Sequence, residues 1–98
     1  MSADAAKWTL SPTVRLLRRR FGNETIVYNE ASGQTHLFDP LTDWLLHQVE
    51  LGPVSEPDLV DRAMAETGAE REITAQRVKQ ILAAFDLEGL AEQMRDGA

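Results

Sequence analysis

The chain has 98 residues, of which 43% are hydrophobic and 27% charged, the balance of an ordinary globular protein, and we take residues 1–98 as a single domain. The absence of cysteine excludes disulfides, thiolate catalysis and the usual structural zinc sites, and no apolar run approaches the roughly 18 residues of a membrane-spanning helix. The first residues also lack the pattern of a secretion signal, so we expect a cytoplasmic protein.

Charge is distributed unevenly along the chain, whose net charge is −6. Residues 23–98 hold five basic and fifteen acidic side chains, and so acidic a body argues against nucleic-acid binding. Residues 1–22 are locally basic. Their arginines form either a solvated strand face or a patch that meets acidic groups of a partner, and the candidate patch is Arg15, Arg18 and Arg20.

The first part of the chain predicts three strands separated by two turns. β-branched and aromatic residues favour strands, whereas Gly22 and Gly33 suit turns because glycine tolerates a positive φ. We expect Gly33 to be left-handed within a five-residue hairpin loop, residues 30–34. Trp8 lies outside every predicted element. The predicted strands are residues 14–21, 25–29 and 35–38.

Three helices are predicted after residue 38. Asp39 followed by Pro40 is typical of a helix start, and Ser55 and Thr74 occupy equivalent capping positions. Glycines at 52, 68 and 89 end the three helical patterns. The first helix should place Trp44 in the core, and the apolar stripe of the third helix consists of Val78, Ile81, Leu82 and Phe85. Three strands followed by three helices predict an α+β fold in which the helices cover one face of an antiparallel sheet.

One stretch of the sequence resembles a known family. The hairpin run "YNEASGQTHLF", together with an N-terminal tryptophan, resembles the PqqD family of peptide chaperones, and most of all its HPr-rel-A system branch. The resemblance covers about residues 8–90, which we take as the ordered core. The residues that carry it are Trp8, Val27, Tyr28, Asn29, Ser32, Gly33, Thr35, His36 and Leu37.

This resemblance implies a small winged-helix-like domain that is not an enzyme and holds no cofactor. Such domains, also called precursor-peptide recognition elements, bind the leader part of a ribosomal precursor peptide and present it to a modifying enzyme or kinase-like protein. The peptide adds as a strand to residues 35–38, and its side chains enter a groove beside the third helix. The implied peptide-binding residues are Thr35, His36, Leu37, Phe38, Val78 and Leu82.

Each of these assignments has an alternative. The strand edge could instead be covered by a second copy of the chain or by the N-terminal arm, and the stripe of the third helix could belong wholly to the core. His36 and His47 do not make a metal site, and Ser32 with His36 lacks the partners of a nucleophilic triad. At the level of function, the alternatives are a winged-helix DNA-binding regulator and a structural subunit of an enzyme complex.

Overall fold

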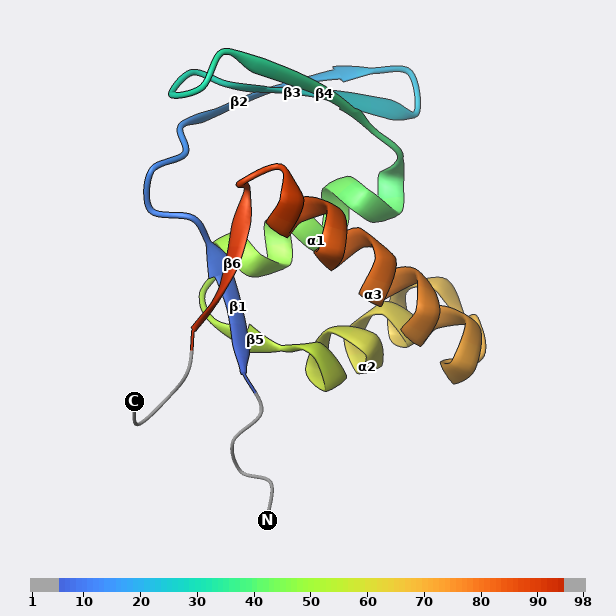
Figure 1. The fold of residues 1–98 in the computed structure, drawn as a ribbon. Coiled ribbons are helices and arrows are strands. Elements are labelled where there is room, and N and C mark those ends of the chain that lie inside the picture. The colour runs from blue at the N-terminus through green and yellow to red at the C-terminus, as the bar shows by residue number, and fades with distance from the viewer. Residues whose placement is uncertain (1–5, 95–98) are drawn as a thin grey trace.

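The structure is a computed structural model that describes residues 6–94 (Figure 1). Within this range the chain forms three helices and two three-stranded antiparallel sheets, so the predicted α+β class is confirmed. The elements in chain order are β1 (Lys7–Leu10), β2 (Leu16–Phe21), β3 (Glu24–Asn29), β4 (Gln34–Phe38), α1 (Pro40–Glu50), β5 (Val54–Ser55), α2 (Glu56–Thr67), α3 (Arg71–Leu87) and β6 (Ala91–Met94).

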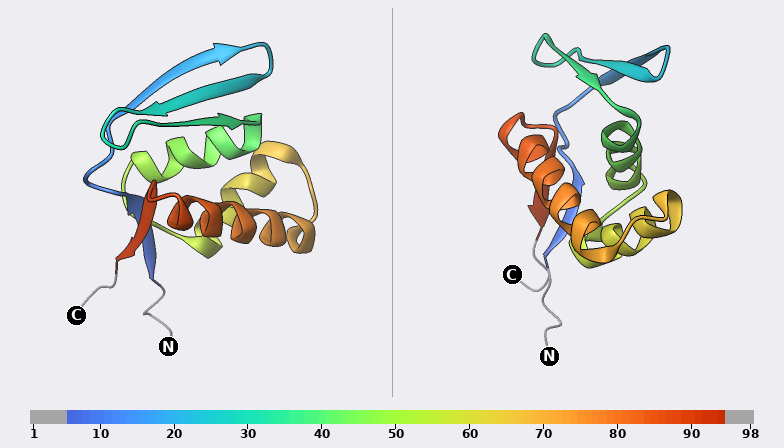
Figure 2. Two further views of the ribbon diagram at one scale, coloured as in Figure 1. Left: turned by 45° about the horizontal axis from the view of Figure 1, so that its top comes forward. Right: turned by 90° about the vertical axis from the view of Figure 1, so that its right-hand side faces the viewer.

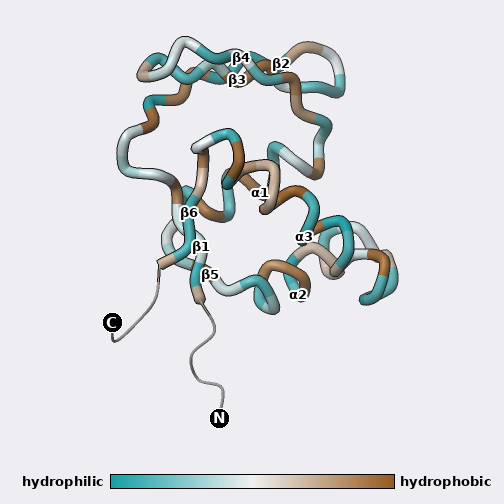
Figure 3. Tube along the Cα trace, in the orientation of Figure 1, coloured by the Kyte–Doolittle hydropathy of each residue, from teal (hydrophilic) through white to brown (hydrophobic). Residues whose placement is uncertain are grey.

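The predicted sheet is present and has the order β2-β3-β4. The loop between β3 and β4 has four residues, one fewer than predicted, because Asn29 pairs with Gln34 in the register of the ladder. The sheet lies across the helices as a separate layer, with α1 and α3 beneath one of its faces (Figure 2). Hydrophobic positions occur both in its strands and in the helices below (Figure 3).

A second, smaller sheet was not predicted. Its order is β5-β1-β6, and it brings the two ends of the described chain side by side, with Lys7 opposite Met94 and Trp8 opposite Gln93. Trp8 therefore lies in a strand and is only 6% exposed, contrary to the prediction that it lies outside the regular elements. These strands have four, two and four residues, too few for a periodic pattern to reveal.

The helix starts were predicted correctly in two cases out of three. The carboxylate of Asp39 accepts a hydrogen bond from the Thr42 amide at 2.8 Å, and the Ser55 hydroxyl accepts one from the Asp58 amide at 3.2 Å. Thr74 was wrongly predicted as a cap, because α3 begins at Arg71, ahead of its apolar stripe. Thr74 is instead 4% exposed within the helix.

The core lies between the helices and both sheets. Its fully buried side chains include Leu45 and Leu46 of α1. Trp44 is half-buried and packs against the edge of the core, so its prediction as a core residue is only partly right. Val27 is the one side chain of the β2-β3-β4 sheet that the helices cover completely. The sheet is thus held to the helices by few buried contacts.

The hairpin turn provides the first test. Gly33 has φ 81°, and a Cβ built on it would meet nothing within 4 Å, so Gly33→Val should introduce backbone strain without a clash. We expect a loss of about 1–2 kcal/mol in the free energy of unfolding, or roughly 5–15 °C in Tm. Thermal denaturation should show little change for Ala31→Val, two residues earlier in the same loop. Equal shifts for the two variants would contradict a left-handed turn at Gly33.

Candidate functional site

The edge strand β4 has one free side. It pairs with β3 from Thr25↔Phe38 to Asn29↔Gln34, and no strand of residues 6–94 pairs with its other edge. Its side chains alternate: His36 and Phe38 are half-buried and face the helices, whereas Leu37 is 60% exposed on the opposite face. The free backbone edge of β4 runs beside α3 (Figure 2). An unpaired edge of this kind can accept hydrogen bonds from, and donate them to, an additional strand.

A groove lies between β4 and α3, with a volume of about 210 Å³. Its floor is aromatic and aliphatic, since the rings of Phe38 and Phe85 are 5.8 Å apart and Ile81 lies next to them. Charged and polar side chains of α3 surround this floor. The lining residues are Phe38, Thr42, Arg77, Gln80, Ile81, Ala84, Phe85, Glu88 and Leu90. The groove therefore offers an apolar pocket directly next to an open strand edge.

Sequence reasoning placed the wrong residues of α3 in the wall of this groove. Val78 is 0% exposed and Leu82 1% exposed, and neither is among the residues that line the groove, so both belong to the core. The flank that faces the groove includes Arg77, Ile81 and Ala84 instead. This flank lies one position away along the helix, and its spacing of four and three residues is as regular as that of the predicted stripe.

The predicted edge residues differ in what they face. His36 stacks on Phe38, with ring centroids 5.5 Å apart and planes 19° apart. Its Nε2 is buried and finds no hydrogen-bond partner within residues 6–94. Thr35 and Leu37 point away from the groove, so among the four predicted strand residues only Phe38 lines it.

The three members of the predicted arginine patch differ in burial. Arg18 faces the helices and has a side chain that is only 21% exposed. Its guanidinium donates hydrogen bonds to Asp43 at 2.9 Å and to Glu50 at 2.6 Å, which ties β2 to α1. Burial alone would lower the pKa of Arg18, but hydrogen bonds and charge attraction from Glu50 and Asp43 outweigh it and raise this pKa. Arg18 is thus a structural residue, contrary to the prediction, while Arg15 and Arg20 are exposed.

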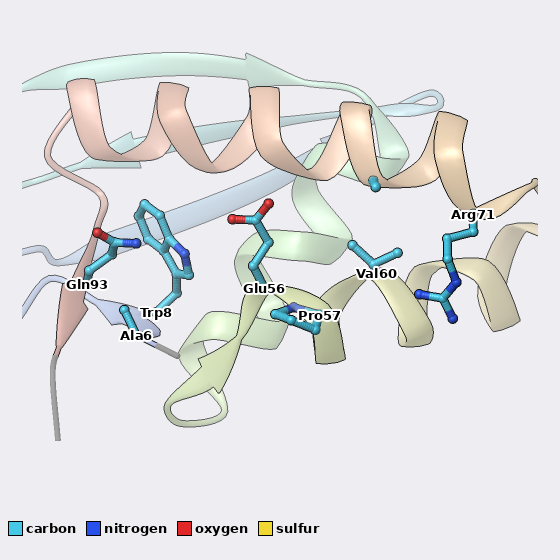
Figure 4. Close-up of a pocket in the computed structure, with 8 residues that line it drawn as sticks. Ala6, Trp8, Glu56, Pro57, Val60, Arg71 and Gln93 are labelled. Carbon is cyan, nitrogen blue, oxygen red and sulfur yellow. The ribbon is translucent and has the colours of Figure 1, made fainter. Parts of the chain in front are cut away.

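A second hollow, of about 430 Å³, lies away from β4 (Figure 4). The Trp8 indole forms one side and Glu56, Pro57 and Val60 of α2 form the other (Figure 4). The Trp8 Nε1 is buried and has no hydrogen-bond partner in the described range. Trp8 is therefore a core residue whose indole also forms one wall of this hollow.

The side chains that could bind a metal ion or take part in catalysis are scattered over the described part of the molecule. Within residues 6–94 no group of three or more histidine and carboxylate side chains is placed to hold a metal ion. The Ser32 hydroxyl accepts a hydrogen bond from the Gln34 amide at 3.2 Å, which assigns it to the turn. His47 lies on the exposed side of α1, 3.4 Å from a Glu50 carboxylate oxygen. In the same range, no helix is both long and apolar enough to cross a membrane.

Comparison with known proteins supports the fold. No family model matches the sequence, and no curated protein matches it either. One solved structure is similar, described as "TbiB1 in Complex with the TbiA(beta) Leader Peptide". Its TM-score is 0.68 at 18% sequence identity, and the match covers 92% of this chain and 96% of that one. This chain therefore shares the fold of a protein whose structure was solved with a leader peptide.

The ion pairs of Arg18 should contribute strongly to stability. Arg18→Met keeps an unbranched side chain but leaves the Asp43 and Glu50 carboxylates, 13% and 25% exposed, without their cation. We expect unfolding to become easier by about 2–3 kcal/mol, less than for a fully buried pair because water still reaches these groups. Urea denaturation should show a change within about 0.5 kcal/mol for Arg19→Met, the exposed neighbour on the other face. Similar losses for both variants would rule out a special role for Arg18.

Proposed function

We propose that this domain binds the leader part of a ribosomally made precursor peptide and presents it to a modifying enzyme, as the resemblance to PqqD-type chaperones implies. The observation that carries the proposal is the open edge of β4 beside the apolar groove of α3. The proposal is further supported because this chain shares the fold of a protein whose structure was solved in complex with a leader peptide.

The physical basis of binding is strand addition. A peptide that pairs with β4 makes backbone hydrogen bonds along Thr35–Phe38, which provide affinity but no sequence selectivity. Selectivity comes from alternate side chains that enter the groove over Ile81 and Phe85. Full burial of one large apolar side chain is worth about 1.5–3 kcal/mol, enough to discriminate between peptides.

Presentation to an enzyme would use the other face of the sheet. On that face, side chains of neighbouring strands lie in rows across the sheet, and an added strand would extend these rows with its own side chains. The rows are Leu17–Tyr28–Thr35 and Arg19–Ile26–Leu37. This face exposes apolar groups, with Leu17 54%, Tyr28 38% and Leu37 60% exposed. An enzyme lying on it would therefore touch the domain and the peptide together. The exposed Arg15 is a candidate for contact with acidic groups of the same enzyme. Arg20 is exposed too, but it pairs with Thr25 in the helix-facing row of Phe38 and so lies on the other side of the sheet.

In this proposal the domain itself performs no chemistry. Its candidate nucleophile, Ser32, is engaged in a turn, and its histidines lie on different elements. A DNA-binding role is less well supported, because α3 carries acidic as well as basic residues. Two of its three basic residues, Arg71 and Arg77, are already paired with aspartates.

The groove can be blocked without disturbing the core. Ala84 is exposed and lines the groove, whereas its neighbour Ala83 is exposed and does not. Peptides selected from a displayed library of random dodecamers serve as probes. For a selected peptide that shifts the amide resonances of Thr35–Phe38, Ala84→Arg should weaken binding at least tenfold, since the long side chain fills the pocket. Ala83→Arg should leave binding unchanged.

Two outcomes would contradict this function. The first is that no selected peptide shifts the amide resonances of β4. The second is that the protein forms a dimer in which β4 pairs with a second copy, which analytical ultracentrifugation would show as a concentration-dependent mass. In that case the strand edge serves self-association.

A further inference from the structure

Charges of opposite sign stand at the two ends of the groove. Arg77 and Glu88 both line it, on either side of Ile81 and Phe85. Arg77 lies in the first half of α3 and Glu88 is its C-cap, eleven positions later, which corresponds to about 16 Å along a helix axis at 1.5 Å per residue. The groove is therefore apolar in the middle, basic at one end and acidic at the other.

The basic end of the groove lies at the end of β4. Asp39 directly follows this strand, and its Oδ2 accepts a hydrogen bond from Arg77 at 3.1 Å. β4 and α3 run in opposite directions (Figure 2, left), so the end of α3 that carries Glu88 points toward the beginning of the strand. A peptide that adds antiparallel to β4 would thus pass Arg77 first and Glu88 last.

The spacing of a strand determines which peptide residues meet these charges. Successive residues rise about 3.3 Å, and only every second side chain faces the groove. Residues i and i+4 are then about 13 Å apart, and long side chains can cover the remaining distance to two groups about 16 Å apart. Residue i+2 lies over the apolar middle of the groove.

We propose that the groove selects peptides by the order of their charges: an acidic residue, then an apolar residue two positions later, then a basic residue two positions after that. This rests on the proposed function and specifies its ligand. The direction follows from the sheet, in which both existing pairings are antiparallel. Antiparallel pairing is also slightly the more stable of the two per residue.

Asp39 competes with the peptide for Arg77. The Arg77 and Asp39 side chains are 44% and 48% exposed, so their ion pair is weak and can exchange partners. Asn caps helices as well as Asp does, so Asp39→Asn should keep the start of α1 while it frees Arg77. This variant should bind an acid-first peptide more tightly, by about threefold.

Two synthetic peptides of identical composition test the proposal. Both are capped eleven-residue peptides with Gly-Ser flanks; one has the centre Glu-Thr-Phe-Thr-Lys and the other Lys-Thr-Phe-Thr-Glu. Titration calorimetry at low salt should show about tenfold tighter binding of the acid-first peptide, because two attractive contacts replace two repulsive ones. The preference should shrink at high salt.

Charge-reversal variants provide the control. Arg77→Glu combined with Glu88→Lys should invert the preference, so that the base-first peptide binds more tightly. Arg71→Glu combined with Asp86→Lys should retain the original preference. This pair lies on the same helix, outside the groove, and Arg71 makes an exposed ion pair with Asp61 that resembles that of Arg77. The matched pair separates a local effect from a change in overall charge.

The possible failures are distinguishable. Equal binding of both peptides would overturn the charge order and leave peptide binding intact. Tighter binding of the base-first peptide by the unmodified protein would overturn the antiparallel direction. If neither peptide binds while library-selected peptides still shift the β4 resonances, the proposed spacing is wrong. If no peptide affects β4 at all, the proposed function fails along with this inference.

Discussion

The partly buried ion pair between β2 and α1 is the interaction on which the arrangement of the two layers depends. Only Val27 is completely buried beneath the β2-β3-β4 sheet, so apolar contact alone attaches it weakly. Arg18 extends from β2 to α1 and binds two carboxylates, Asp43 and Glu50, which are about two turns apart on that helix. At the opposite edge of the sheet, Phe38 rests on Phe85. The sheet is therefore supported along both edges, and the space beside β4 keeps a defined width.

A free strand edge is a risk for a soluble protein, and this edge has features that limit the risk. β4 has five residues and is followed after one residue by the proline that opens α1, so little backbone is available to a stray strand. α3 borders the edge, and an incoming strand must fit its side chains between the backbone and that helix. Shortness and the adjoining groove together favour a ligand with suitable side chains over indiscriminate pairing.

Local chemistry explains which features the sequence could predict. The left-handed Gly33, the caps at Asp39 and Ser55 and the stop at Gly68 each depend on a few neighbouring residues, and the structure contains all of them. The small β5-β1-β6 sheet depends on pairing between residues as distant as Lys7 and Met94, for which no local pattern exists. The start of α3 was missed for another reason: Arg71–Ile73 form a helical turn without a side-chain cap.

The groove itself shows the limit of periodicity as a guide. α3 packs against α2 and the core on one side and approaches β4 on another. Its apolar residues reveal that the helix is buried but not which neighbour each residue meets. Val78 and Leu82 were therefore assigned to the groove, although both are at most 1% exposed and lie outside its lining. The α3 wall of the groove is formed instead by a less hydrophobic row of side chains, which includes Arg77, Ile81 and Ala84.

Asp39 lies where β4, α1 and α3 meet, and its carboxylate contacts both helices. It follows β4 directly, its Oδ1 caps α1 and its Oδ2 holds Arg77 of α3. Burial by itself would raise the pKa of Asp39, but hydrogen bonds from Thr42 and the charge of Arg77 outweigh this and lower it. Because this pKa is lowered in the folded protein, the charged carboxylate stabilises the folded state at pH values above the ordinary pKa of aspartate. This stabilisation is lost as the pH falls through the pKa of Asp39 in the folded state. At neutral pH the junction therefore stays ionised, and the residue that begins α1 also positions the cation at one end of the groove.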